Sequence, residues 1–188
     1  MKDIIKITKD FAIESHNSIN QKYNGKPYGE SHLQFAYNIG EMFIYLIPED
    51  DRDDILAAIW AHDIIEDVTS VTFNDLKKAT NERVAELAYV CTNEKGRTRA
   101  ERANGKYYRG IKRTKYAKFV KLCDRIANVK YSLDTKHRMF KMYQKEQKHF
   151  QKSLTDNIFD KIYKLIHLRT ESNYNDMWIY LNSLINEK

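Results

Sequence analysis

The segment from His62 to Asp67 carries four ionisable side chains in two pairs, each pair four residues apart. On a continuous helix His62 and Glu66 would share one face, and Asp63 and Asp67 would share the next. An imidazole beside a carboxylate suits a first-row metal, and two further carboxylates could orient or deprotonate water. The alternative is a solvated acidic helix end. Because the mostly apolar Ile55–Trp60 leads directly into this segment, a buried His-Asp pair would need a partner or a metal.

A further acidic residue, Asp124, lies in a strongly hydrophobic stretch that is predicted to be helical. Its face of that helix is otherwise mostly apolar and is formed by Ala117, Val120, Ala127, Asn128 and Tyr131. A carboxylate there needs a partner, and the adjacent Arg125 does not face it. Two explanations stay open: an ion pair with a basic residue elsewhere, or a metal ligand with Asn128 one turn later to bind substrate or ligand water.

His32 begins a predicted helix, directly after a loop that contains glycine and proline. Taken alone, such a histidine is more often a cap or a surface residue than a ligand. The other histidines have no comparable acidic neighbour and are predicted to be surface or ordinary packing residues: His16, His137, His149 and His167.

Helices must position these residues, because the 188 residues include only 6 glycines and 2 prolines, against roughly 12% of both in average usage. So few turn-forming residues disfavour sandwiches, barrels and propellers and favour an all-α domain. Apolar spacing predicts helices over residues 3 to about 20, 31 to about 47, 49 to about 65 and 115 to about 132. Three amphipathic segments close the chain, anchored by Met139, Tyr143 and Phe150, by Ile158, Ile162 and Leu165, and by Met177, Trp178, Leu181 and Ile185.

The apolar spacing that predicts helices is weaker between residues 66 and 118. Val68–Phe73 is β-branched but too short to assign as a strand, and Asn74 and Asn81 are expected to cap two further helices. Residues 95–118 contain ten Lys and Arg against the single acid Glu101. This basic stretch is either a solvated, mobile loop or a source of phosphate-binding side chains.

The length of 188 residues suits a single domain, 1–188, with a real core. Cys91 and Cys123 form neither a disulfide framework nor a metal knuckle. No apolar run could span a bilayer, and the charged N-terminus does not read as a signal peptide, so a cytoplasmic protein with no membrane partner is expected. The net charge of +6 suits an anionic partner, whether a nucleotide, a nucleic acid or an anionic surface.

Taken together, His32, His62-Asp63 and Asp124 have the order and spacing of the HD metal-dependent phosphohydrolase superfamily. The longer motif His-Asp-x-x-Glu-Asp at residues 62–67, with residues 120–128 downstream, resembles the hydrolase domain of the RelA/SpoT proteins. The loop at residues 22–28 resembles the basic nucleotide loop of that family. The resemblance covers about residues 10–155, followed by C-terminal helices over 156–188. The chain has no room for the synthetase and regulatory regions of long members, so it looks like a stand-alone small alarmone hydrolase.

The resemblance implies an all-α HD-type helical bundle with one Mn²⁺ that removes the 3′-pyrophosphate from ppGpp or pppGpp. Four residues would hold the metal: His32, His62, Asp63 and Asp124. Two acids would activate and position water: Glu66 and Asp67. Because neighbouring carboxylates raise one another's pKa, one is expected to orient the water and the other to handle its proton. Three residues would contact the nucleotide: Lys22, Asn24 and Asn128.

The sequence departs from the family pattern in two places. Three residues, 29–31, separate Tyr28 from His32, where the family usually has two. Lys22 is followed by Tyr23, where the family usually has arginine followed by lysine. Lysine lacks the planar fork of arginine, although Tyr23 could stack on a base instead. The choice between guanine and adenine therefore stays open, as does the metal, since such ligands also suit Fe, Co, Ni or Zn.

Two other functions compete with this one. An HD phosphohydrolase could act on another nucleotide, such as a deoxynucleotide or a 3′-phosphorylated dinucleotide. A basic nucleic-acid-binding protein could retain the HD residues as a relic, but a relic would be expected to have lost at least one of the six site residues. Stand-alone alarmone hydrolases can also act as antitoxins, which makes a cognate alarmone synthetase a conceivable partner that the residues themselves do not test.

Overall fold

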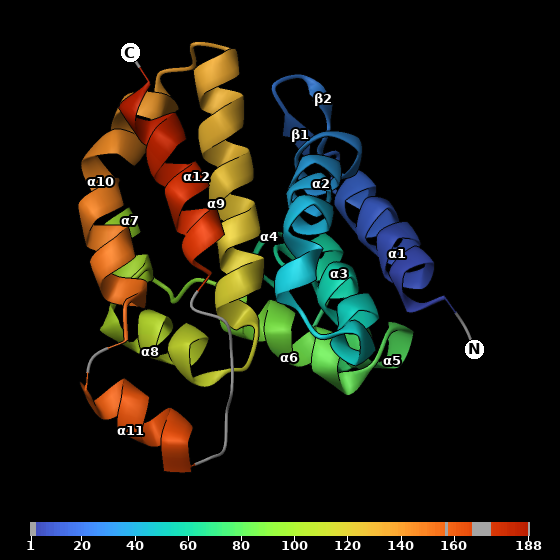
Figure 1. The fold of residues 1–188 in the computed structure, drawn as a ribbon. Coiled ribbons are helices and arrows are strands. Elements are labelled where there is room, and N and C mark those ends of the chain that lie inside the picture. Colours follow the sequence, from blue (N-terminus) through green and yellow to red (C-terminus); the bar gives the residue numbers. More distant parts are fainter. Residues whose placement is uncertain (1–2, 157, 167–173, 188) are drawn as a thin grey trace.

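The structure, a computed structural model, describes residues 3–156, 158–166 and 174–187. Within them the fold is all-α, as predicted, apart from the two-stranded hairpin of β1 (Lys22–Tyr23) and β2 (Lys26–Pro27) (Figure 1). The longer helices are α1 (Ile4–Ser18), α2 (Gln34–Phe43), α3 (Arg52–Ala61), α6 (Glu82–Cys91), α8 (Gly105–Arg113), α9 (Ala117–Asp134), α10 (Met139–Leu154), α11 (Ile158–Ile166) and α12 (Asn175–Asn186). The shorter segments are η1 (Gly29–Leu33), η2 (Ile44–Leu46), η3 (Glu49–Asp51), α4 (Ile64–Asp67), α5 (Phe73–Ala79) and α7 (Arg99–Arg102).

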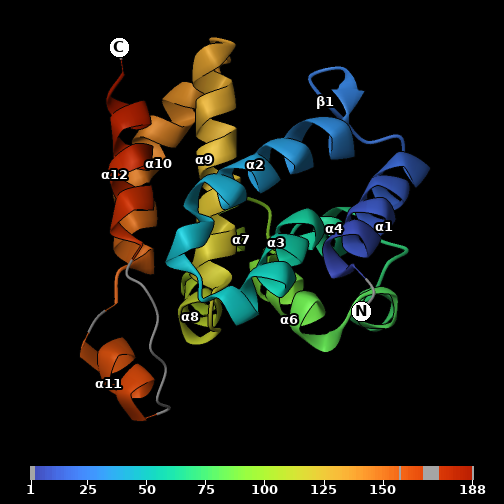
Figure 2. The same ribbon diagram turned by 45° about the vertical axis from the view of Figure 1, so that its right-hand side comes forward.

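Helix α9 is the centre of the fold. Helices α2, α3, α6, α8, α10 and α12 all contact it, and it runs between the N-terminal helices and the α10–α12 pair in both Figure 1 and Figure 2. Its buried residues, among them Phe119, Leu122 and Ile126, belong to the larger of two hydrophobic clusters. The smaller cluster includes Trp60 and Ile64 and lies where α1 contacts α3 and α4. Each such side chain stabilises the fold by about 1.5–3 kcal/mol, so α9 holds Asp124 firmly inside.

Gly40 allows helix α2 to approach helix α3 closely. A Cβ atom at Gly40 would lie 2.3 Å from the Cδ1 atom of Ile59 and 3.4 Å from a methyl group of Leu56. Since α2 follows the turn that carries His32 and α3 ends just before His62, this contact brings the two histidines together.

The predicted helix over residues 3–20 is confirmed as α1, and Asp3 caps it by accepting a hydrogen bond from the Lys6 amide at 3.1 Å. The predicted helices over 31–47 and 49–65 both exist, but neither is continuous. The first divides into η1, α2 and η2, and the second into η3, α3 and α4. The prediction of one unbroken helix through the His62–Asp67 motif is therefore wrong, because the chain makes a turn at His62 and Asp63.

The weakly patterned middle of the chain is also helical. No strand forms at Val68–Phe73, where all residues are described. Helix α5 is capped by Thr72 and not by Asn74, because Thr72 and Asp75 form a reciprocal capping box. Asn81 caps α6 as predicted.

The basic stretch 95–118 is not a mobile loop. It folds into α7 and α8, and the buried Tyr107 and Ile111 anchor α8 to the larger cluster. Lys112 and Lys118 are themselves buried and pair with Asp160 and Asp156. Side chains of this stretch therefore serve partly as structural cations.

The three predicted C-terminal segments form α10, α11 and α12. The anchors of α12 at Met177, Leu181 and Ile185 are buried. The anchors predicted for α11 are exposed, with Leu165 at 75%, so the prediction that they pack inward is wrong for this helix. None of the helices in the described part of the chain is both long and apolar enough to span a membrane.

Candidate metal centre and active site

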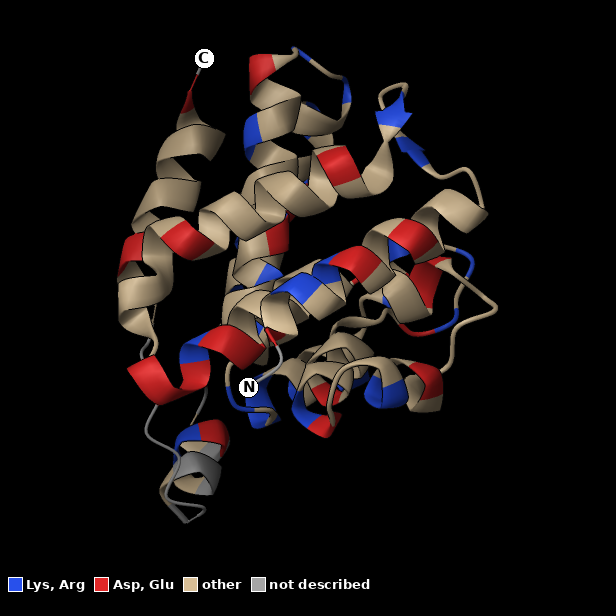
Figure 3. Ribbon diagram, turned by 90° about the vertical axis from the view of Figure 1, so that its right-hand side faces the viewer, with Lys and Arg blue, Asp and Glu red and all other residues tan. Residues whose placement is uncertain are grey.

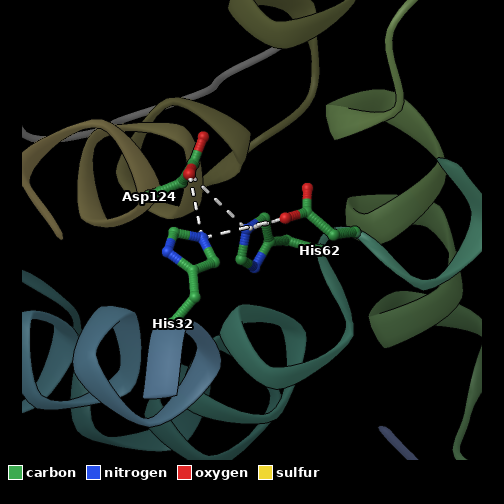
Figure 4. A group of neighbouring side chains, drawn as sticks. His32, His62 and Asp124 are labelled. Carbon is green, nitrogen blue, oxygen red and sulfur yellow. Dashed lines mark ion pairs between the residues drawn. The ribbon is translucent and has the colours of Figure 1, made fainter. Parts of the chain in front are cut away.

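Four side chains that the sequence predicts as metal ligands meet in the interior. His32, His62, Asp63 and Asp124 each offer one ligand atom, and these atoms all lie within 4.8 Å of one another. Nε2 of His62 is 3.0 Å from Oδ2 of Asp63, and Nε2 of His32 is 3.3 Å from Oδ1 of Asp124. Figure 4 shows His32, His62 and Asp124 pointing toward one another from separate segments. Two imidazoles and two carboxylates suit a divalent first-row metal.

The environment of His62 fits a metal ligand. Its Nδ1 donates to the carbonyl oxygen of Ile59 at 2.7 Å, which leaves the lone pair of Nε2 facing the cluster. This Nε2 atom is buried and faces carboxylate oxygens of Asp63 and Asp124, at 3.0 and 3.7 Å. A buried nitrogen that converges with two carboxylates is placed where a divalent cation could bind all three groups.

The turn between α3 and α4 places two consecutive residues in the cluster. Consecutive side chains on an α-helix point about 100° apart, so an unbroken helix would direct either His62 or Asp63 away. Helix α3 ends at Ala61 and α4 begins at Ile64, while the amide of Asp67 donates to the carbonyl oxygen of Asp63 at 2.9 Å. The turn thus brings both ligands inward, and α4 carries Glu66 and Asp67 along the edge of the same site.

His32 enters the cluster from the π-helical turn η1. A π-helical turn absorbs one residue more than an α-helical turn would, and such turns are frequent at functional sites. The turn spans the three residues between Tyr28 and His32. Gly29 packs against Ile13 so closely that a Cβ there would lie 2.8 Å from Cγ1 of Ile13. In this conformation Nε2 of His32 lies 3.3 Å from Oδ1 of Asp124.

Both carboxylates of the cluster are held by further side chains. The hydroxyl of Tyr28 donates to Asp63. Asp124 accepts a hydrogen bond from Asn128 Nδ2 at 2.6 Å and lies 2.7 Å from Nζ of Lys121. Burial works against the charge of Asp124, but Lys121 and the two histidines hold its pKa well below the ordinary value. Asp124 thus has a cationic partner, although this lysine lies one turn earlier on the same helix and not elsewhere in the fold. That Asp124 is a metal ligand stays a prediction, with its carboxylate facing the other candidate ligand atoms.

Glu66 and Asp67 lie outside the ligand cluster and have different surroundings. Glu66 accepts hydrogen bonds from the amide and the side chain of Asn93, at 3.0 and 2.9 Å. Asp67 accepts one from Gln21 Nε2 at 2.7 Å. Burial, and secondarily the charge of Asp63, raise the pKa of Asp67 to about 6. One carboxylate is therefore fixed by two donors, while the other is poised to exchange a proton near neutral pH.

Gln21 is in turn oriented by His16. Nδ1 of His16 lies 2.6 Å from Oε1 of Gln21. Since the amide nitrogen of Gln21 faces the Asp67 carboxylate, its oxygen must accept from His16. Burial lowers the pKa of His16, so this ring is neutral and donates its one proton to the amide. The chain His16–Gln21–Asp67 fixes which way the Asp67 carboxylate faces.

A cavity of about 330 Å³ opens beside the cluster. Its lining includes Asp63, Asp124 and both predicted catalytic acids. Among its cationic side chains are Arg99, Arg102, Lys121 and Arg125. Only Arg99 and Arg102 of the ten basic residues in the stretch 95–118 line it. The cavity thus combines an acidic metal-binding corner with a basic wall.

The predicted nucleotide contacts are only partly at this cavity. Asn128 lines it and accepts a hydrogen bond from the Tyr23 hydroxyl at 3.0 Å. Lys22 and Asn24 are exposed on the hairpin, which carries lysines on both strands (Figure 3), and do not line the cavity. Tyr23 packs against His32 and Tyr131, so it supports the cluster and is not free to stack on a base.

The remaining histidines follow the prediction in part. His16 is fully buried and serves the site through Gln21, whereas His137 and His149 are exposed. His149 also lines the cavity, which the sequence did not indicate. His167 lies outside the described residues.

Several supporting residues were not predicted. Tyr28 and Gln21 lie within or beside the loop that suggested nucleotide binding, and their positions before His32 were the available signal. Asn93 carries no local signal, because only the tertiary fold brings α6 alongside α4. Glu146 of α10 likewise reaches the cavity from a helix with an ordinary amphipathic pattern.

Comparison with models of protein families finds no match for the sequence, and no curated protein matches it. Among solved structures, the fold is similar to that of a metazoan ortholog of SpoT, described as hydrolysing ppGpp and having a role in starvation responses. The TM-score is 0.68 and the sequence identity 19%, over 98% of this chain and 94% of that chain. At this identity the similarity establishes the fold. The chain therefore shares the all-α fold of that SpoT ortholog.

Proposed function

We propose that the protein is a metal-dependent hydrolase that removes the 3′-pyrophosphate of ppGpp or pppGpp. The observation that carries this proposal is the cluster of two histidines and two aspartates, with two further carboxylates beside it, at a cavity that also has a basic wall. The fold shared with a ppGpp hydrolase supports it. The reaction gives GDP or GTP and pyrophosphate, with the oxygen of water ending on the pyrophosphate.

The metal ligands in this proposal are His32, His62, Asp63 and Asp124. The donor set and the buried Nε2 of His62, which faces both carboxylates, fit a divalent cation, for which we propose Mn²⁺. When bound, such an ion lowers the pKa of water and polarises a phosphoryl oxygen. Tyr28 and Asn128 orient the two carboxylates that face it.

Asp67 handles the proton and Glu66 orients the water. A carboxylate whose pKa is about 6 accepts a proton near neutral pH and can return it to the 3′ oxygen that leaves as a hydroxyl. Glu66 is less free to do so, because two hydrogen bonds from Asn93 fix both of its oxygens. Gln21 directs the Asp67 carboxylate, which sets where the proton is taken up.

The basic wall neutralises the phosphates as negative charge moves onto the leaving group. Lys121 is the cation nearest to the ligand cluster, since its Nζ lies 2.7 Å from Asp124. Arg99 and Arg102 are the contributors from the basic stretch.

The test uses purified protein with Mn²⁺ and a panel of ppGpp, pppGpp, ppApp, dGTP and NADPH, with products separated by anion exchange. Release of GDP and pyrophosphate from ppGpp, abolished by a chelator, is the expected result. Turnover of another panel member alone would keep the site and replace the substrate. A protein that binds metal but hydrolyses nothing in the panel would refute the enzyme and favour a binding protein.

Variants separate the proposed roles. His62→Ala and Asp124→Ala should lose both metal and activity, whereas Glu66→Ala and Asp67→Ala should keep the metal and lose activity. His137→Ala is the matched control, since His137 is exposed and does not line the cavity. Wild-type rates in both acid variants would show that the roles given to Glu66 and Asp67 are wrong.

A further inference from the structure

Glu146 of α10 places its carboxylate against two guanidinium groups in the cavity. Arg99 donates from Nε to Oε1 at 3.0 Å and from Nη2 to Oε2 at 3.2 Å. Arg125 donates from Nη1 to Oε2 at 3.2 Å. All three residues line the cavity that also holds Asp63 and Asp124. One carboxylate thus joins cations from two other helices, α7 and α9.

Arg125 is fixed in its position. Its side chain is only 7% exposed, and its Nη2 donates to the carbonyl oxygen of Tyr143 at 3.3 Å. The guanidinium lies over the rings of Tyr143 and Phe150, at 4.5 and 4.8 Å from their centroids. Cation–π contacts with two rings hold it against the cavity wall, so it cannot turn away toward solvent.

The same wall is short of hydrogen-bond acceptors. Nε of Arg125 and Nε of Arg102 are buried and have no hydrogen-bond partner among the described residues. Buried donors of this kind are usually satisfied, because leaving them unpaired costs free energy.

Glu146 offers these arginines two negatively charged oxygen acceptors, as a phosphate group would. Arginine's planar fork binds carboxylate and phosphate oxygens in the same two-point manner. Partial burial works against the charged form of Glu146, but hydrogen bonds from Arg99 and Arg125 hold its pKa below the ordinary value. The carboxylate is therefore ionised at neutral pH, and the phosphate position already holds a negative charge.

We propose that Glu146 is a specificity-determining residue, an internal anion that occupies the place of a substrate phosphate on Arg99 and Arg125. It thereby weakens binding of nucleotides that carry a second phosphate group. The inference rests on the proposed function, since it takes the cavity to be a nucleotide site. The phosphate group concerned is the 5′ group, which is not cleaved, because the cleaved group must reach the His/Asp cluster.

A 5′-diphosphate must either displace Glu146 from Arg99 or bind beside its charge. Displacement is feasible because Arg99 is 49% exposed and Glu146 33% exposed, and exposed ion pairs are weak. Arg125 stays in place in either case. Glu146 thus sets how strongly the 5′ phosphates contribute to affinity without touching the reacting atoms.

The test compares Glu146→Gln with Glu94→Gln. Glutamine keeps the size of Glu146 and one acceptor oxygen but removes the charge. Glu94 is 34% exposed, pairs with Lys106 at 2.9 Å and does not line the cavity, so its substitution changes the net charge equally at a distance from the site. Binding of GDP and of guanosine to the protein in EDTA is measured by calorimetry.

We expect Glu146→Gln to bind GDP about tenfold more tightly than the wild type, with guanosine unchanged. Glu94→Gln should leave both affinities unchanged. Equal GDP affinity in Glu146→Gln and the wild type would overturn the inference, as would an equal gain for guanosine. If the ion pair were purely structural, Glu146→Gln would lower thermal stability without changing the preference for GDP over guanosine. Arg99→Gln is the second variant, and it keeps the inference testable even if Glu146→Gln does not fold. Arg99→Gln should weaken the binding of GDP but not the binding of guanosine. Unchanged GDP affinity in this variant would also overturn the inference.

The binding test does not depend on hydrolysis. If Glu146→Gln tightens GDP binding while the wild type hydrolyses no ppGpp, the proposed function fails and the inference stands. If the wild type hydrolyses ppGpp but Glu146→Gln leaves GDP binding unchanged, the inference alone fails. In an active enzyme, Glu146→Gln should lower KM for ppGpp and leave kcat unchanged.

Discussion

Replacing Asp67 with asparagine should stabilise the metal-free protein at neutral pH while abolishing the proposed activity. The pKa of Asp67 rises from an ordinary 3.8 to about 6, first because of burial and then because of the nearby charge of Asp63. The folded protein therefore binds this proton more tightly than the unfolded chain does. As the pH rises from about 4 through about 6, ionisation of Asp67 removes stability from the folded state.

The pKa difference sets the size of the effect. A shift of about two pKa units corresponds to about 3 kcal/mol at pH 7. Asp67 keeps part of its solvent contact, and screening reduces this figure to about 1.5 kcal/mol. Asparagine removes the charge and can still accept the hydrogen bond from Gln21. A gain of this size raises the melting temperature of a protein of this length by about 3–6 °C.

Urea denaturation in EDTA at pH 7 and at pH 4 measures this gain. The gain of Asp67→Asn should be clear at pH 7 and much smaller at pH 4, where Asp67 is protonated in the folded state and partly protonated in the unfolded chain. Glu66→Gln is the matched control, because it removes the same charge one residue away but loses an acceptor that Asn93 uses, so no stabilisation is expected. A gain that is equal at both pH values, or absent at pH 7, would refute the reasoning.

Three other substitutions test the supporting residues. Tyr28→Phe removes the donor to Asp63 and should lower metal affinity about 10–100-fold, measured by metal titration; unchanged affinity would contradict the role given to Tyr28. Gln21→Leu should lower kcat about tenfold with metal content and KM retained, because the Asp67 carboxylate loses its orientation; a change in KM alone would argue against this. Gly40→Ala should destabilise the fold by about 1–3 kcal/mol in urea denaturation, since the new methyl group would meet Ile59 at 2.3 Å; wild-type stability would show that α2 and α3 can separate.

The composition and the apolar periodicity were sufficient to predict the fold class and most of the helices. The breaks were not predictable in the same way. Ile55–Asp67 reads as one helix because its residues have no breaker, yet the chain turns at His62 and Asp63. Local propensity could not predict this turn, because it depends on tertiary contacts that bring His32 and Asp124 to the same point.

In the candidate site, too, some residues could be predicted from the sequence and others could not. The four ligand candidates were predicted through the family resemblance, because His32 taken alone is more often a cap or a surface residue. Asn93 and Glu146 were missed because their importance lies in the side chains they meet across the cavity. An asparagine just after a helix and a glutamate on an amphipathic helix are usually solvated, and only the fold distinguishes these two from their neighbours.

The π-helical turn that carries His32 is both a break in a predicted helix and part of the candidate site. A π-helical turn takes up one residue more than an α-helical turn, so a regular α-helix over Gly29–Leu33 would rotate His32 by about 100° and direct its imidazole away from the cluster. The turn η1 instead keeps His32 beside Asp124 and leaves Tyr28 in contact with Asp63. A π-helical turn is less favourable than an α-helical one, so its persistence requires compensation from the contacts it allows. The contacts of His32 with Asp124 and of Tyr28 with Asp63 supply such compensation at this turn.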